Sequence, residues 1–222
     1  MMKRMEDNFD HRFWTGSSYR SPDYKGESDD RGNALAVVSG LASKDKYPAL
    51  KTLLTTEYHA SPYMEKYVLE ALFCMDATDE ALDRIRKRYK TMVEYPGLTT
   101  LPENWIDETI QLKPGEPMIN AFWGTYNHGW SGGPLTLLSQ KVCGIEPTSP
   151  GFRTFRIRPQ MGYLNQASCH VSSVSGEISV NIQRKGKKLQ IDVTVPSGTT
   201  AEVVFPSGKT KTLQSGTHSI RG

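Results

Sequence analysis

The chain has 222 residues, of which 37% are hydrophobic and 23% charged, and its formal net charge is +3. This is the balance of a globular protein, and no apolar run approaches the roughly 18 residues that a membrane-spanning helix needs. The opening residues, MMKRMEDNFDHRFW, carry acids where a signal peptide would need an apolar core. We therefore expect no membrane partner, and either a cytoplasmic protein or a chain that begins inside a larger one, whose compartment (periplasmic, extracellular or cytoplasmic) stays open.

The charge is unevenly distributed along the chain. Residues 147–222 contain ten basic and only three acidic side chains, so they are basic, whereas residues 1–146 are acidic overall. The basic residues of the second part alternate with apolar ones, as in FRTFRIRP, which is typical of a strand with one solvated face. No aromatic platform or recognition motif accompanies this charge, so we expect no nucleic-acid partner.

The first 145 residues have helical periodicity. Acids open one predicted helix, a proline lies in the first turn of the next, and a Ser-Pro pair starts the third. Thr78 is the predicted cap of a helix that carries acids early and bases late. The expected helices cover residues 29–43, 47–59, 61–75, 78–93 and 132–144. We expect them to pack as sequential antiparallel pairs around a shared core.

The pattern changes after Pro147. Short runs rich in β-branched residues follow one another, separated by turn sequences such as RKGKK, PSGT and QSGT. Regularly spaced short strands predict an antiparallel sandwich or barrel. The sequence therefore predicts two domains, 1–146 and 147–222, with the proline- and glycine-containing segment EPTSPG at their boundary.

Two loops contain the residues best suited to chemistry. YPGLTTLPENWIDE holds Glu103 and Trp105, and NAFWGTYNHGWSGGP holds Phe122, Trp123, Tyr126, His128 and Trp130. Aromatic rings stack on the apolar faces of sugars while carboxylates and imidazoles bind hydroxyl groups, so these loops predict a sugar site. The simpler interpretations are that Glu103 is a solvated acid, that His128 is structural and that Trp123 belongs to the core.

Other chemistries have no support in the sequence. The remaining histidines, His11, His59, His170 and His218, are scattered, and the three cysteines share no metal-ligand spacing. No nucleophile-elbow, phosphate-loop or zinc-protease motif is present. We expect neither a metal nor a cofactor.

The chain resembles the C-terminal third of bacterial α-L-rhamnosidases, which are six-hairpin (α/α)6-barrel glycoside hydrolases. The resemblance runs through DDRGNALAVVSGL, HASPYMEKYVLEAL, GLTTLPENW and YNHGWSGGP, and then through PGFRTFRIRPQ and VPSGTTAEVVFPSG. It implies a partial (α/α)6 helical toroid over residues 1–146, followed by an antiparallel β-sandwich over residues 147–222. It also implies a rhamnose-containing glycan as the carbohydrate partner.

The resemblance assigns roles to residues of the two loops. Glu103 falls on the family's general base, which activates water in an inverting hydrolysis. Trp105 follows it and would wall the sugar subsite, and His128 falls on a histidine that contacts substrate. Asn127 belongs to the same Asn-His loop, and Trp130 occupies a more variable position of the substrate-binding region.

Two departures from the family pattern matter. Pro102 replaces a bulky residue before the glutamate, and nothing in residues 1–60 matches the acidic segment that carries the general acid. We therefore expect a fragment that is inactive alone, because inversion needs an acid as well as a base. The alternatives are an (α/α)-barrel hydrolase acting on uronic acids or other sugars, and a non-catalytic carbohydrate-binding or structural module.

Overall fold

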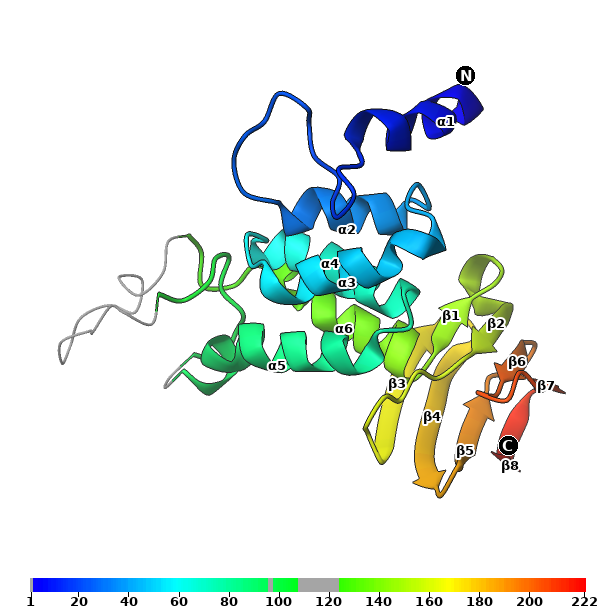
Figure 1. Ribbon diagram of the computed structural model, residues 1–222. Helices are drawn as coiled ribbons and strands as arrows, with labels where there is room; N and C mark the ends of the chain where they lie inside the picture. Colours follow the sequence, from blue (N-terminus) through cyan, green and yellow to red (C-terminus); the bar gives the residue numbers. More distant parts are fainter. Residues whose placement is uncertain (1, 96–97, 108–123) are drawn as a thin grey trace, which may run out of the picture. The chain divides into compact units, whose positions relative to one another are not determined.

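The computed structural model describes residues 2–95, 98–107 and 124–222, with side chains from Asn8 onward (Figure 1). The chain divides into two compact units, Met1–Pro134 and Leu135–Gly222. We call them the helical unit and the β unit. No helix in the described ranges combines the length and the apolar character needed to cross a membrane.

The helical unit contains five helices of eight or more residues among its described residues: α1 (Met2–Phe13), α2 (Asp30–Val38), α3 (Tyr47–Thr56), α4 (Pro62–Cys74) and α5 (Thr78–Glu94). The Ser-Pro start is confirmed, because the Ser61 hydroxyl accepts a hydrogen bond from the Met64 amide at 3.4 Å and Pro62 opens α4. The predicted cap at Thr78 is wrong. Ala77 precedes the first turn of α5, and its methyl group offers no capping acceptor.

Helix α4 lies at the centre of this unit. It contacts α2, α3 and α5, and α2, α3 and α4 lie side by side in Figure 1. Fully buried side chains form this core: Val68, Leu69 and Leu72 come from α4, and Leu50 and Leu54 come from α3. These apolar positions recur at helical spacing, which is why the periodicity located the helices correctly.

The β unit begins within α6 (Gly133–Leu137) and continues through a π-helical turn at Leu138–Val142. One sheet has the order β1-β2-β6-β7, made of Ile145–Pro147, Thr154–Ile157, Thr200–Val204 and Thr210–Leu213. The other has the order β3-β4-β5-β8, made of Gln166–Ser173, Gly176–Lys185, Lys188–Val195 and Gly216–Arg221. The second sheet is antiparallel throughout.

Alternating apolar residues bury one face of each sheet. Ile178, Val180 and Ile182 on β4 are fully buried, and the residues between them are more exposed. Strands β4 and β5 are joined by the two residues Gly186 and Lys187, and Gly186 has φ +65°. Tight hairpin turns need this left-handed conformation, which glycine adopts at no steric cost.

The expected fold class is wrong in two respects. Helices α2, α3 and α5 pack around α4, with α2 against α4 as the most extensive helix contact, and the described helices form no clear toroid. The second part is not purely antiparallel, because β2 pairs in parallel with β6 over Thr154–Ile157. Periodicity shows that a segment has an apolar face, but it does not show which neighbour covers that face.

The division between Pro134 and Leu135 lies twelve residues before the boundary that the sequence suggested. The change in composition marks where strands begin, whereas the compact unit also includes the end of α6 and the π-helical turn. The division into domains 1–146 and 147–222 stays a prediction.

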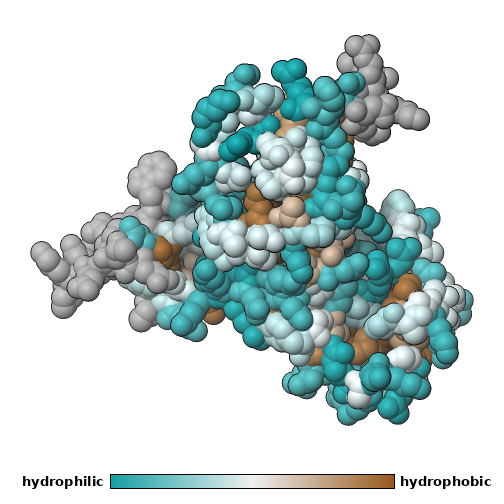
Figure 2. Space-filling view, viewed as in Figure 1, coloured by the Kyte–Doolittle hydropathy of each residue, from teal (hydrophilic) through white to brown (hydrophobic). Residues whose placement is uncertain are grey.

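Figure 2 shows a visible face that is mainly hydrophilic, with hydrophobic side chains in small separate areas.

Candidate active site

The two loops that carry the candidate residues are joined by hydrogen bonds in the helical unit. The Glu103 amide donates to the Thr125 carbonyl at 2.9 Å, and the His128 amide donates to the Leu101 carbonyl at 3.0 Å. The hydroxyl of the buried Ser131 donates to the Pro102 carbonyl at 2.6 Å. The loop around Glu103 is thus fixed against the loop around His128, although about 25 residues separate them in sequence.

The Glu103 carboxylate lies at the centre of this contact. Its Oε2 accepts a hydrogen bond from the Thr125 amide at 3.0 Å and from the Thr125 hydroxyl at 3.3 Å. The same oxygen lies 3.7 Å from Nδ1 of His128, which is itself 3.1 Å from the Thr125 hydroxyl. The Glu103 side chain is 24% exposed, so it is sheltered and can still be reached from solvent.

Glycine at position 124 is required by this arrangement. Its φ is +117°, and a Cβ built there would lie 2.7 Å from Oε2 of Glu103. A side chain at this position would therefore be strained and would also displace the carboxylate. The Gly124-Thr125 pair consequently allows the backbone to approach the carboxylate and donate to it.

An aromatic group lies beside the carboxylate. The rings of His128 and Trp130 are 4.0 Å apart, and Tyr63 from α4 lies 5.4 Å from Trp130. The Trp130 indole N–H donates to the Glu103 carbonyl at 3.0 Å, which fixes the orientation of the ring. Tyr63 and Trp130 are both exposed, so they offer an accessible aromatic surface next to the two polar groups.

Trp105 packs in a different direction. Its indole N–H donates to the Ala60 carbonyl at 2.8 Å, and its ring meets Tyr89 edge-on at 5.1 Å. The guanidinium of Arg88 lies over the Trp105 ring at 4.1 Å. Tyr58, Lys87, Arg88 and Trp105 are among the residues around a pocket of about 200 Å³ here. A sugar-walling role for Trp105 stays a prediction.

Other expected residues are less informative. Asn127 is exposed next to His128. Phe122 and Trp123, which the aromatic-loop prediction included, lie outside the described residues, as does Gly97 at the start of the GLTTLPENW motif. A hollow of about 690 Å³ lies in the β unit around residues 147–152 and 172–174, and the residues that line it include no ionisable side chain.

Three positions that shape the site were not predicted from the sequence. Thr125 holds the carboxylate, Ser131 ties the two loops, and the Ala60 carbonyl accepts from Trp105. The glycine before Thr125 was the available signal for the first, since it marks a close backbone approach. A backbone carbonyl such as that of Ala60 leaves no signal in a sequence. Within the described ranges no group of three or more His, Cys, Asp or Glu residues could hold a metal ion.

The chain is similar to known proteins in both sequence and fold. Residues 144–220 match the family model for the bacterial alpha-L-rhamnosidase C-terminal domain. An alpha-L-rhamnosidase of Streptomyces avermitilis is 31% identical over 136 residues, which is 59% of this chain and 13% of that protein. One of Formosa agariphila is 26% identical over 192 residues, 81% of this chain and 20% of that protein. The chain therefore spans about a fifth or less of the length of these relatives.

Solved structures show the same likeness in the fold. The Streptomyces avermitilis alpha-L-rhamnosidase complexed with L-rhamnose has a TM-score of 0.74 at 22% identity, covering 99% of this chain and 23% of that one. The enzyme from Dictyoglumus thermophilum has a TM-score of 0.73 at 17% identity, covering 99% of this chain and 28% of that one. These homologues are named alpha-L-rhamnosidases, which are glycoside hydrolases. The expected resemblance to the C-terminal portion of an α-L-rhamnosidase is therefore confirmed, and it is firmest over residues 144–220.

Proposed function

We propose that this chain supplies the general base of an inverting α-L-rhamnosidase that releases terminal α-L-rhamnose from glycans or glycosides. Glu103 is the base, and His128, Asn127 and Trp130 bind the sugar. The general acid is contributed from outside these 222 residues. The chain by itself is therefore inactive, because one carboxyl group cannot perform both tasks.

The proposal depends mainly on the environment of the Glu103 carboxylate. Oε2 accepts both hydrogen bonds from Thr125, and Nδ1 of His128 also lies close to Oε2. These contacts fix the orientation of the carboxylate. We assign proton acceptance to Oε1, because the contacts from Thr125 and His128 all reach Oε2. The exposed rings of Trp130 and Tyr63 supply an apolar surface suited to the face of a pyranose.

In the proposed reaction each group has one task. Oε1 of Glu103 takes a proton from water as the water oxygen bonds to the anomeric carbon. The bond from that carbon to the leaving oxygen breaks at the same time, and the external acid protonates that oxygen. In inverting enzymes the two carboxyl groups are roughly 6.5–9.5 Å apart, which leaves room for the water.

The test is Glu103→Gln in the complete enzyme, with a nitrophenyl α-L-rhamnoside as substrate. Glutamine keeps the size and an acceptor oxygen but cannot take the proton, so kcat should fall on the order of 10²–10⁴-fold with little change in binding. Glu94→Gln, at an exposed position on α5, is the matched control and should keep full activity. By contrast, His128→Ala should weaken both binding and turnover, because it removes a sugar contact.

Two results would contradict the proposal. Unchanged kcat in Glu103→Gln would remove Glu103 as the base. Turnover by the isolated 222-residue chain at a rate comparable to the complete enzyme would remove the requirement for an external acid.

A further inference from the structure

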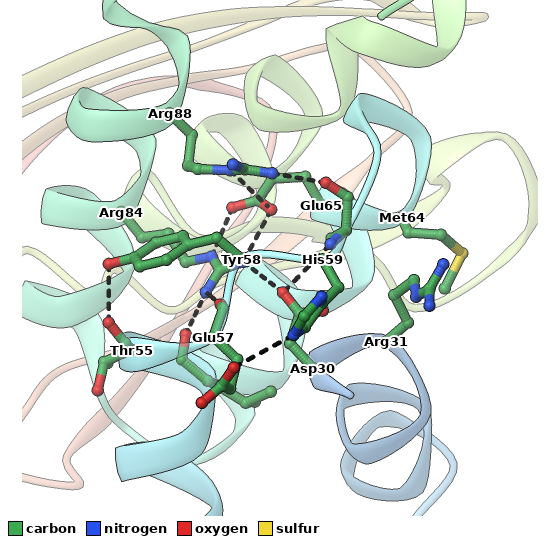
Figure 3. Close-up of polar contacts among 12 residues, drawn as sticks. Asp30, Arg31, Thr55, Glu57, Tyr58, His59, Met64, Glu65, Arg84 and Arg88 are labelled. Atoms are coloured by element: carbon green, nitrogen blue, oxygen red, sulfur yellow. Dashed lines mark hydrogen bonds and ion pairs between the residues drawn. The ribbon is translucent and has the colours of Figure 1, made fainter. Parts of the chain in front are cut away.

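Four charged side chains form a buried ion network between three helices of the helical unit (Figure 3). They are Asp30 on α2, Glu65 on α4, and Arg84 and Arg88 on α5. The side chains of the two acids are completely buried, and those of Arg84 and Arg88 are 2% and 15% exposed. Burying charges costs free energy even when they are paired, so a network of this kind is weak evidence for a purely stabilising role.

Arg84 is the hub of the network. Its guanidinium donates to Glu65 at 2.6 and 3.0 Å and to Oδ2 of Asp30 at 2.7 Å. The remaining donors reach the Leu54 carbonyl at the end of α3 and, at 2.7 Å, the carbonyl of Glu57. Arg84 therefore fixes the start of the loop 57–61, which connects α3 to α4.

The network also holds the peptide groups on either side of Ala60, in the middle of that loop. The Ala60 amide lies 3.4 Å from Oδ2 of Asp30, and its carbonyl accepts from Arg88 at 2.5 Å. Arg88 in turn lies 3.5 Å from Glu65. Burial lowers the pKa of Arg88, while the Glu65 charge raises it and the Arg84 charge lowers it further.

The Ala60 carbonyl has a second donor, which leads to the active-site loop. Trp105 Nε1 donates to it at 2.8 Å, and the same Arg88 lies over the Trp105 ring at 4.1 Å. Trp105 is two residues beyond Glu103 on the loop 98–107. Trp105, near the end of this loop, is thus attached to Ala60 and Arg88. The residues just before Glu103 are attached to Ser131 and His128 through the carbonyls of Pro102 and Leu101.

We propose that the buried ion network, acting through the Ala60 carbonyl and Arg88, positions Trp105 and thereby the carboxylate of Glu103. The inference rests on the proposed function, since it needs Glu103 to be the base. Arg88 and Trp105 are positioning residues in this scheme. A carboxylate that must meet a water and an anomeric carbon loses rate when its loop shifts by about an ångström, even if the sugar still binds.

Two conservative substitutions in the complete enzyme test this. Trp105→Phe keeps a ring beneath Arg88 and beside Tyr89 but removes the N–H donor to Ala60. Arg88→Lys keeps the charge but removes the planar fork that bonds Ala60 while covering Trp105. With a nitrophenyl α-L-rhamnoside, each should lower kcat about tenfold or more and leave KM within about twofold.

Trp14→Phe is the matched control. Trp14 packs 5.0 Å from Tyr19, and the amine of Lys46 lies 5.5 Å over its ring, so it has a similar environment without any link to Glu103. It should leave kcat and KM unchanged within about twofold. Tryptophan-to-phenylalanine replacement should lower the thermal midpoint to a similar small extent at both sites, so stability alone would not separate them.

The outcomes separate this inference from the proposed function. If Glu103→Gln abolishes turnover while Trp105→Phe and Arg88→Lys keep normal kcat, the positioning role is wrong and the base assignment stands. If Trp105→Phe raises KM at unchanged kcat, Trp105 contacts the sugar and does not act through Glu103. If Glu103→Gln is fully active, the proposed function itself fails.

Discussion

The helical unit and the β unit have different kinds of core. In the β unit the buried side chains of the described residues are apolar apart from Thr199, and they follow the alternation of the strands. The helical unit buries Asp30, Lys46, Glu65 and Arg84 as well as its leucines. An apolar core specifies a shape by packing, whereas a buried ion network specifies which loops meet, because each charge must reach its partner. The candidate active site lies in the helical unit, which has the buried ion network.

The difference can be measured separately in the two units. All four tryptophans precede Leu135, so tryptophan fluorescence reports on the helical unit. Far-ultraviolet circular dichroism reports on both units, and it includes the strand signal of the β unit. Unfolding followed by the two methods would therefore show whether a substitution affects one unit or both.

The largest effect is expected for Arg84→Met in the isolated chain. Methionine fills much of the space but leaves Asp30 and Glu65 buried without their main partner. The free energy of unfolding of the helical unit should therefore fall by about 3–5 kcal/mol. Urea unfolding monitored by tryptophan fluorescence would measure this. Lys90→Met on the same helix is the control, since its contact with Glu94 is long and exposed, and it should change stability by less than about 0.5 kcal/mol. An Arg84→Met chain as stable as the parent would show that the network is unimportant for the unit.

A smaller effect is expected for Ile182→Val in the β unit. Ile182 is fully buried on β4, and removing one methylene group from such a site costs about 0.5–1.5 kcal/mol. The loss should appear in circular dichroism during urea unfolding. Val174→Ala is the control, because Val174 is 87% exposed and lies outside the core. Equal losses for both substitutions would contradict the description of the β unit as a packed apolar core.

The smallest effect is expected from acid titration of the helical unit. A hydrogen bond from Lys51 at 2.7 Å, followed by a backbone hydrogen bond, lowers the pKa of Glu80. A lowered folded-state pKa contributes stability above the unfolded value of about 4.3, and this contribution disappears as the pH falls through the folded pKa. The urea concentration at the midpoint of unfolding, followed by tryptophan fluorescence, should therefore fall between about pH 5 and pH 3. This fall should be smaller in Glu80→Gln. Glu94→Gln should retain the full drop, and an identical drop in both variants would contradict the assignment.

The sequence by itself determined the local structure and the identity of the candidate residues. Helical spacing located α2, α3, α4 and α5, and alternation located the strands after Pro147. The order of the GLTTLPENW and YNHGWSGGP motifs led to Glu103 and His128, whose Oε2 and Nδ1 atoms lie 3.7 Å apart. These features depend on neighbouring residues in the chain, so a sequence contains them directly.

Tertiary structure alone decided which segments meet. The parallel pairing of β2 with β6 joins residues 46 positions apart, and Arg84 joins Asp30 to Glu65 across three helices. The contacts of Thr125 with Glu103, and of Trp105 with the Ala60 carbonyl, are of the same kind. A periodic pattern shows that a side chain is buried or a strand is formed, but its partner is set by the packing of the whole unit, and a backbone carbonyl has no residue type to reveal it.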